Sequence, residues 1–126
     1  MAGAACLSDA LIPLLQKSSQ PRIVFVSSAV GSLTQTLDPS SSHYGANAPA
    51  YKASKAAMNM LMATYARTLK EDKWRVNSCT PQLSATAFSK GVGRDPCIGA
   101  VIACQLATGE VEGTGGFWDK EGKIAW

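Results

Sequence analysis

The sequence predicts an α/β fold, and three observations lead to that prediction. Residues 22–27 (RIVFVS) form a nearly continuous β-branched and aromatic run, which is typical of a parallel strand buried on both faces. Residues 50–70 contain no glycine or proline and are rich in alanine, methionine and leucine, which favours a long helix. Residues 74–80 form a second short strand that Pro81 ends. This strand–helix–strand order implies a right-handed parallel crossover.

The segments on either side of the first strand differ in their periodicity. Residues 3–17 predict a helix, kinked at Pro13, whose apolar face consists of Leu7, Ala10, Leu11, Leu14 and Leu15. Residues 31–49 collect glycine, serine and proline without a hydrophobic period, so we expect a long surface loop there. Loops of this length often border functional sites.

The C-terminal third predicts one more helix and one more strand. Asp95 and Pro96 are suited to the N-cap and first turn of a helix that Gly109 ends. The apolar face of that helix is expected to comprise Ile98, Val101, Ile102 and Leu106. Residues 115–118 indicate a short strand, followed by a turn at 120–122.

Length and composition indicate one ordinary globular unit. A chain of 126 residues is too short for separate cofactor and substrate domains, and 46% apolar with 17% charged residues is typical of a folded protein. The net charge of +3 comes from scattered lysines and arginines, which argues against nucleic acid as a partner. Without a basic leader or a bilayer-length apolar stretch, we expect no membrane contact and a cytoplasmic location.

The cysteines predict neither a metal site nor a disulfide framework. The four cysteines form no CxxC pair and show no spacing to histidines that a metal site would need: Cys6, Cys79, Cys97 and Cys104. We expect reduced, buried thiols.

Tyr51 and Lys55 are four residues apart on the predicted long helix, so their side chains share one face. A tyrosine is a poor base at neutral pH, but an ammonium group about 4 Å away stabilises the phenolate by roughly 4 kcal/mol at an effective dielectric near 20. Such a phenol can give or take a hydroxyl proton while hydride moves between a carbonyl carbon and a nicotinamide. A shuffled chain of this composition contains such a pair roughly one time in five, so the flanking sequence must support the interpretation.

The flanking sequence resembles the short-chain dehydrogenase/reductase family. Residues 51–59 (YKASKAAMN) are similar to the family's YxASKxA helix, and IVFVSS before Ala-Val-Gly31 is similar to the strand that carries its catalytic serine. Residues 75–86 (RVNSCTPQLSAT) resemble the strand that ends in the family's Pro-Gly-x-x-x-Thr loop. The motifs keep the family's order, the resemblance covers essentially the whole chain, and fungal carbonyl-reductase-like members are the most similar.

The resemblance implies catalytic roles for three residues. Ser28 would steady the substrate oxygen, Tyr51 would be the general acid–base, and Lys55 would tune Tyr51 and bind the nicotinamide ribose. The implied reaction is reduction of a small carbonyl compound or oxidation of a secondary alcohol. The implied assembly is a dimer through the helix 51–70.

The resemblance also implies a nicotinamide cofactor, NADP or NAD, with NADP preferred. Its binding residues would include Tyr51 and Lys55 together with Pro81, Ser84 and Thr86 of the loop after the second strand. The Ser84 backbone amide would face the carboxamide, and Thr86 would contact polar groups of the cofactor.

Two departures from the family pattern qualify these expectations. Gln82 stands where the family has glycine, so its side chain would obstruct the cofactor or its backbone would need a glycine-type angle. The family's glycine-rich phosphate loop and catalytic asparagine would lie before Met1. We therefore expect residues 1–126 to form a single partial NAD(P)-binding domain, the C-terminal half of a Rossmann-type doubly wound sheet with about three strands and flanking helices, impaired in catalysis.

Plainer interpretations of these residues stay open. Tyr51 can be an aromatic residue that packs at the helix start, with Lys55 a solvated charge, while Ser28 can simply end a strand. Thr86 can be a loop hydroxyl bonded to nearby backbone, and His43 is expected to be a surface histidine without a catalytic role. At the level of function, a noncatalytic partner of a full-length relative and an incomplete gene product remain alternatives to the oxidoreductase.

Overall fold

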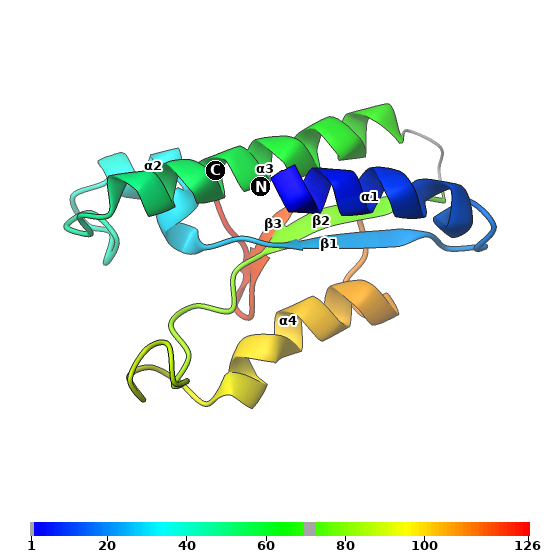
Figure 1. Cartoon of the computed structure of the whole chain (residues 1–126). Coiled ribbons are helices and arrows are strands. Elements are labelled where there is room, and N and C mark those ends of the chain that lie inside the picture. Colours follow the sequence, from blue (N-terminus) through cyan, green and yellow to red (C-terminus); the bar gives the residue numbers. More distant parts are fainter. Residues whose placement is uncertain (1, 70–72) are drawn as a thin grey trace.

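The computed structural model describes residues 2–69 and 73–126. Its elements follow the order α1 (Ala2–Leu15), β1 (Arg22–Val26), η1 (Ala29–Gly31), α2 (Leu33–Leu37), α3 (Pro49–Thr68), β2 (Arg75–Cys79), α4 (Pro96–Thr108), β3 (Phe117–Asp119) and β4 (Gly122–Lys123). The strands lie in the order β1-β2-β3-β4, with the first three parallel and β4 antiparallel to β3. Figure 1 shows α1 and α3 over one face of this sheet and α4 over the other. The predicted α/β fold is confirmed, with β4 as an additional strand.

The long helix and its two strands match the predicted crossover closely. The α3 helix begins at Pro49, which suits the first turn of a helix because its missing N–H would have no partner there. It ends at Thr68, and Lys70 of the predicted range lies outside the described residues. Parallel pairing places Val24 of β1 opposite Asn77 of β2. The carboxyl ends of both strands therefore meet at the same edge of the sheet.

The caps of α4 are those that the sequence predicts. The side chain of Asp95 accepts a hydrogen bond from the Cys97 amide at 2.8 Å, and Gly109 ends the helix in the left-handed conformation at φ 91°. The predicted apolar face is too broad. Ile102 and Leu106 are buried, whereas Ile98 and Val101 are exposed, because Gly99 lies in close contact with the loop after β2 and sets which face turns inward.

The hydrophobic core is divided by the sheet into two clusters. Under α1 and α3 the buried members are Phe25, Met62, Tyr65, Trp74 and Val76. Under α4 they are Cys79, Ile102 and Leu106. Because two helices cover one face and a single helix the other, the first cluster is the larger, and it fixes α3 against the strands.

Two predictions of local structure are wrong. The segment 31–49, predicted as a loop, contains the helix α2 and only the last residue of η1, and the Ser32 side chain accepts from the Gln35 amide at 3.0 Å. The α2 helix spans five residues, so it offers no hydrophobic period that sequence reasoning could detect. The strand β1 is not buried on both faces, because it forms an edge of the sheet and leaves Val26 half exposed.

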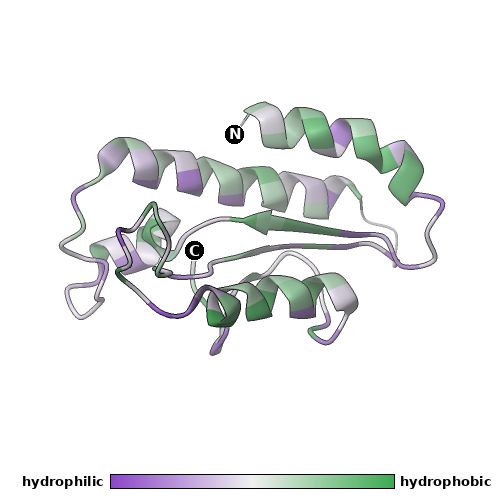
Figure 2. Ribbon diagram, turned by 60° about the horizontal axis from the view of Figure 1, so that its bottom comes forward, coloured by the Kyte–Doolittle hydropathy of each residue, from purple (hydrophilic) through white to green (hydrophobic). Residues whose placement is uncertain are grey.

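The predicted apolar face of α1 is correct only at Leu15. Leu7 and Leu14 are 61% and 62% exposed, while Ala4, Ile12 and Leu15 pack against the core. Figure 2 shows hydrophobic colour along most of α1, so hydrophobicity alone could not select the inward face of this helix.

The predicted burial of the cysteines is confirmed for one of the four. Cys79 is buried in β2, and burial raises the pKa of its thiol to about 11. Cys6, Cys97 and Cys104 are exposed, because each lies on the outer side of α1 or α4. All four are free thiols.

Among residues 2–69 and 73–126, no helix combines the length and the apolar character that crossing a bilayer requires.

Tyr65 gives the core a predicted pH dependence. Its hydroxyl donates to Asp9 Oδ1 at 2.5 Å, and this bond, with burial and the negative charge of Asp9, raises the pKa of Tyr65 to about 12 from 10.0. The native state therefore keeps a proton that the unfolded chain loses between pH 10 and 12. The stabilisation is complete below pH 10 and is lost as the pH rises through 12.

Tyr65→Phe is expected to lower the free energy of unfolding by about 1–2 kcal/mol at pH 8, because the bond to the carboxylate is lost. Urea unfolding at pH 8 and at pH 11.5 measures the difference between the two proteins, which should shrink at the higher pH. A difference that is the same at both pH values would rule out the bond to Asp9 as its cause. Tyr44→Phe, at an exposed position, is the control.

Candidate active site

Ser28 and Tyr51 meet at one cavity of about 590 Å³ at the carboxyl edge of the sheet. Ser28 follows the end of β1, Tyr51 lies in the first turn of α3, and Thr80 follows β2. The lining residues are Ser28, Ala29, Val30, His43, Ala46, Ala48, Tyr51, Lys52, Thr80, Pro81, Gln82, Leu83, Ser84, Thr86, Phe88 and Ser89. Ligands of open α/β sheets bind beyond the carboxyl ends of the strands, and this cavity occupies that position.

The structure separates the two adjacent serines. Ser27 is buried, and its hydroxyl donates to the Lys55 carbonyl oxygen at 3.2 Å, which ties the end of β1 to α3. Ser28 lies at the cavity wall, and its side chain caps no helix. Of the two hydroxyls, only that of Ser28 lies in the lining of the cavity.

Lys55 is fixed between the strand and the tyrosine ring. Its Nζ donates to the carbonyl oxygen of Val26 at 3.1 Å and lies 5.6 Å from the centre of the Tyr51 ring. Within the described part of the chain, no hydrogen bond joins Lys55, Tyr51 and Ser28 to one another. Of the three predicted catalytic residues, Ser28 and Tyr51 line the cavity, whereas Lys55 contacts the Tyr51 ring without being a lining residue.

Gly31 allows α3 to approach the end of β1 this closely. A Cβ atom at Gly31 would lie 2.7 Å from Lys55 Cβ, 2.8 Å from the Lys55 carbonyl carbon and 2.9 Å from the Ala56 nitrogen. Two of these three atoms belong to the helix backbone and cannot rotate away. Glycine is therefore required at this position if Lys55 is to keep its place.

The loop after β2 brings Pro81, Ser84 and Thr86 to the same cavity. Ser89 braces the loop, because its Oγ donates to the Ser84 carbonyl at 2.6 Å and accepts from the Thr86 amide at 2.9 Å. Among the described residues, the Ser84 amide nitrogen has no hydrogen-bond partner. The predicted contact of this amide with the carboxamide stays a prediction.

Gln82 adopts the glycine-type conformation that its position in the family pattern predicts, at φ 56°. Its side-chain nitrogen donates to Asp119 Oδ2 and Glu121 Oε2, both at 3.2 Å, and its oxygen accepts from Arg94. Desolvation alone would raise the pKa of Glu121, but the charges of Lys120 and Arg94, with a hydrogen bond to Asp119, lower it. The side-chain amide of Gln82 is thus held by Arg94 and by two carboxylates of the β3–β4 turn. The sequence does not reveal this hydrogen-bond network.

Two substitutions at Gln82 separate backbone strain from the side-chain network. Gln82→Ala and Gln82→Gly both remove the hydrogen bonds to Arg94, Asp119 and Glu121, but only glycine tolerates the left-handed backbone. We expect the alanine variant to be less stable than the glycine variant by about 1 kcal/mol, measured by urea unfolding. Equal stability of the two variants would mean that the backbone relaxes away from φ 56°.

Several cavity residues are not among the predicted site residues. The sequence predicts a surface position for His43, yet it lines the cavity with Ala46 and Ala48 of the segment before α3. Lys52 and Phe88 also line it, and Phe88 is 95% exposed. For His43, Ala46 and Ala48 the sequence signal is the length of the segment between Ser28 and Tyr51, which suggests a rim but not which side chains turn inward.

The glycine-rich phosphate loop of the family has the pattern Thr-Gly-x-x-x-Gly-x-Gly. Residues 108–115 (TGEVEGTG) match this pattern, but their place in the fold is unsuitable for a dinucleotide phosphate. A phosphate loop leads from a strand into a helix N-terminus, whose free amides attract the anion. Here Gly109 closes the C-terminus of α4, and Glu112 pairs with Arg75 at 3.2 Å. The negative end of the helix dipole and the acidic side chains disfavour phosphate.

The residues of the large cavity fit the nicotinamide end of a dinucleotide. Four of the five residues predicted to bind that end line the cavity, namely Tyr51, Pro81, Ser84 and Thr86, whereas Lys55 contacts the Tyr51 ring without being a lining residue. Their roles toward the cofactor stay predictions. In the described ranges, no three His, Cys, Asp or Glu side chains gather as a metal site would need.

Comparisons with known proteins point to one family. Residues 1–96 match the short chain dehydrogenase family. The short-chain dehydrogenase/reductase ATR10 of Stachybotrys chlorohalonatus is 40% identical over 90 residues, which are 71% of this chain and 31% of that protein. The chain spans about a third to a half of the length of the curated relatives it matches.

Solved structures share the fold. Salutaridine reductase of Papaver somniferum superposes with a TM-score of 0.76 at 25% identity, over 94% of this chain and 51% of that one. A short chain dehydrogenase of Shigella flexneri 2a str. 301, solved with NADP, gives a TM-score of 0.67 at 27% identity, over 91% and 47% of the two chains. The sheet thus matches about half of a Rossmann-type domain, and the chain belongs to the short-chain dehydrogenase family of NAD(P)-dependent oxidoreductases.

Proposed function

We propose that this chain carries the catalytic part of an NAD(P)-dependent oxidoreductase that interconverts a small carbonyl compound and the corresponding secondary alcohol. The observation that supports the proposal best is the single cavity shared by Ser28, Tyr51, Pro81, Ser84 and Thr86. These residues come from three segments far apart in the sequence. A purely structural role for each would not require them to line one space.

In the direction of reduction, a bound nicotinamide supplies the hydride to the carbonyl carbon. Ser28 holds the carbonyl oxygen by donating a hydrogen bond from Oγ, and Tyr51 Oη gives that oxygen its proton as negative charge develops there. The ammonium group of Lys55, held by the Val26 carbonyl, stabilises the phenolate that Tyr51 becomes. Water returns the proton to Tyr51, and oxidation of the alcohol reverses these steps.

We propose NADP as the preferred cofactor, because the Shigella relative was solved with NADP. Turnover by residues 1–126 alone should be low, because no glycine-rich turn into a helix N-terminus is available in the described part for the pyrophosphate. Affinity for the nicotinamide end should remain, since the cavity itself is formed by these residues.

Reduced nicotinamide mononucleotide tests whether the chain keeps its affinity for the nicotinamide end, because this compound contains that end of the cofactor without the adenosine half. We expect it to shift the NMR signal of the Ser84 amide at millimolar concentration, nearly as strongly as NADPH does. Adenosine diphosphate, the matched control, should leave that signal unchanged. Absence of a shift with both nicotinamide compounds would contradict the proposal.

A second candidate function is that of a noncatalytic partner of a full-length family member. The open edge of β1 favours it, because an apolar groove lined by Ala4, Leu7, Leu11, Leu15, Phe25 and Met58, among others, runs beside that edge. An uncovered strand edge is a template for pairing with another chain. In such a pairing the helix α3 would supply further contacts, as the predicted dimer through residues 51–70 implies.

Val26→Lys, at the half-exposed end of β1, tests this second candidate. The substitution should weaken co-purification with a full-length relative and leave intact the shift of the Ser84 amide signal that reduced nicotinamide mononucleotide causes.

A further inference from the structure

A second pocket, of about 260 Å³, shares no lining residue with the candidate active site. It lies between α3, the η1–α2 segment and the C-terminal tail, and its lining consists of Gly31, Leu33, Ala56, Asn59, Met60, Ala63 and Trp126. Apart from Asn59 and the indole of Trp126, these residues offer only aliphatic carbon and a thioether. The pocket is therefore an apolar space with few polar groups.

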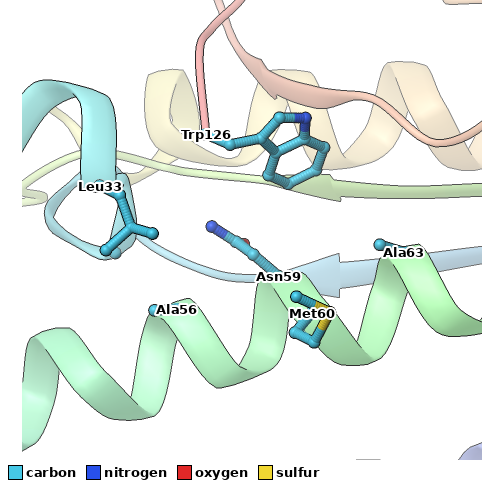
Figure 3. A pocket seen from close by; sticks show the side chains of 7 residues that line it. Leu33, Ala56, Asn59, Met60, Ala63 and Trp126 are labelled. Atoms are coloured by element: carbon cyan, nitrogen blue, oxygen red, sulfur yellow. The ribbon is translucent and has the colours of Figure 1, made fainter.

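Asn59 contributes an unpaired donor to this pocket. The residue is 5% exposed, and its Oδ1 accepts a hydrogen bond at 3.3 Å from Ser78 Oγ, which is itself buried. Its Nδ2 is buried without a partner among the described residues. Figure 3 shows the amide nitrogen of Asn59 directed into the space between Leu33 and Trp126. Native proteins seldom leave a buried donor unpaired. A bound molecule with an acceptor atom in this pocket would give the N–H of Asn59 a partner.

The wall opposite the donor is held in place. The Trp126 ring stacks on Phe117, with 5.4 Å between ring centres and a 16° angle between planes. The Thr34 amide donates to the Trp126 carbonyl at 2.7 Å, which anchors the tail against α2. Met60, in contrast, is 68% exposed, and an unbranched thioether side chain adapts readily to a ligand. The pocket thus combines a firm aromatic wall with an adaptable rim.

A water molecule satisfies this donor poorly, because a buried water needs two to four polar partners and the pocket offers little beyond Asn59. A dry apolar cavity of roughly 150 Å³ can hold a benzene ring, so the larger volume here accommodates a ring with a short substituent. We propose that the pocket binds a small, uncharged, mostly apolar molecule whose carbonyl oxygen accepts from Asn59 Nδ2 and whose ring packs against Trp126.

Two probes of the same shape test the role of the donor. Acetophenone carries a carbonyl oxygen, and α-methylstyrene carries a methylene group in its place. In ¹⁵N NMR titrations of the full chain, acetophenone should shift the signals of the Asn59 side-chain amide and the Trp126 indole. It should bind about three- to tenfold more tightly than α-methylstyrene does. Binding at the candidate active site instead would shift the Ser84 amide, leave Asn59 unchanged and overturn the proposal. Equal affinity for the two probes would also overturn it.

Three variants test whether the probes bind in this pocket. Asn59→Leu should abolish the preference for acetophenone while keeping affinity for α-methylstyrene. Ala63→Phe, which fills the pocket from an exposed position on α3, should abolish both, whereas Ala53→Phe, exposed on the same helix outside the lining, should change neither. Binding that survives Ala63→Phe would overturn the proposal. Asn59 shifts that depend on protein concentration without a probe would also do so, because a second copy would then be the occupant.

Discussion

Replacing Tyr51 by phenylalanine is expected to lower the rate of carbonyl reduction by about 100- to 10,000-fold, the range that a general acid contributes. The substitution removes one oxygen from a half-exposed side chain at the cavity wall, so the fold should be unaffected. The proton would then have to come from water. The measurement is the rate at which reduced nicotinamide mononucleotide is consumed with the ketone cyclohexanone as the acceptor.

The control for this variant is Tyr44→Phe, which makes the same chemical change at an exposed tyrosine outside the cavity lining. Its rate should equal that of the unchanged chain. Binding of reduced nicotinamide mononucleotide should weaken far less than the rate in Tyr51→Phe, because the substitution removes at most one contact to the ribose, whereas the rate also loses its proton donor. If Tyr51→Phe lowered the rate no more than Tyr44→Phe, Tyr51 could not be the acid.

Gly31→Ala is expected to destabilise the fold by about 1–3 kcal/mol, the usual cost of overpacking, and to lower the rate as well. The added Cβ would lie 2.8 Å from the Lys55 carbonyl carbon, so α3 must move away from β1. That movement would break the contact of Lys55 Nζ with the Val26 carbonyl and shift Tyr51 relative to Ser28. Urea unfolding and the same rate assay measure the two effects.

Gly45→Ala is the matched control, because a Cβ at Gly45 meets no atom within 4 Å. It should change neither stability nor rate by a measurable amount. A Gly31→Ala variant with full stability and full rate would show that the close approach of α3 to the end of β1 is unnecessary for the site.

The sequence was sufficient to predict the parts of the fold that rest on strong local signals. The β-branched run at 22–27, the uninterrupted helix from 50 and the Asp95 and Gly109 caps all correspond to observed elements. These signals are local, since each depends on residues within one or two turns. The position of Ser28, Tyr51 and the loop after Pro81 at one edge of the sheet is seen in the structure, where the carboxyl ends of β1 and β2 meet.

Features that depend on distant contacts could not be predicted. The inward face of α1 is set by contact with Phe25 and its neighbours, and a helix rich in leucine on several sides gives no hint of it. The bonds of Gln82 to Arg94 and Asp119 join segments that are distant in the chain. The position of His43 in the cavity follows from a segment whose only α-helix has five residues.

The resemblance to a known family supplied chemistry that spacing alone could not. Tyr51 and Lys55 share a helix face, but in the structure Lys55 Nζ bonds the Val26 carbonyl and lies 5.6 Å from the Tyr51 ring centre. The pair therefore depends on β1 as much as on the helix. Gly31, which no catalytic reasoning singled out, controls the distance between them and the strand.

Deuterium transfer is the most direct test of the proposal that this cavity holds the nicotinamide end and that Tyr51 protonates the carbonyl. Reduced nicotinamide mononucleotide labelled with deuterium at C4 is mixed with cyclohexanone and the chain, and deuterated cyclohexanol is measured by mass spectrometry. We predict labelled alcohol at a rate clearly above that without protein, falling to the protein-free rate with Tyr51→Phe. Labelled alcohol at the protein-free rate with the unchanged chain, or at the same raised rate with Tyr51→Phe, would contradict the proposal.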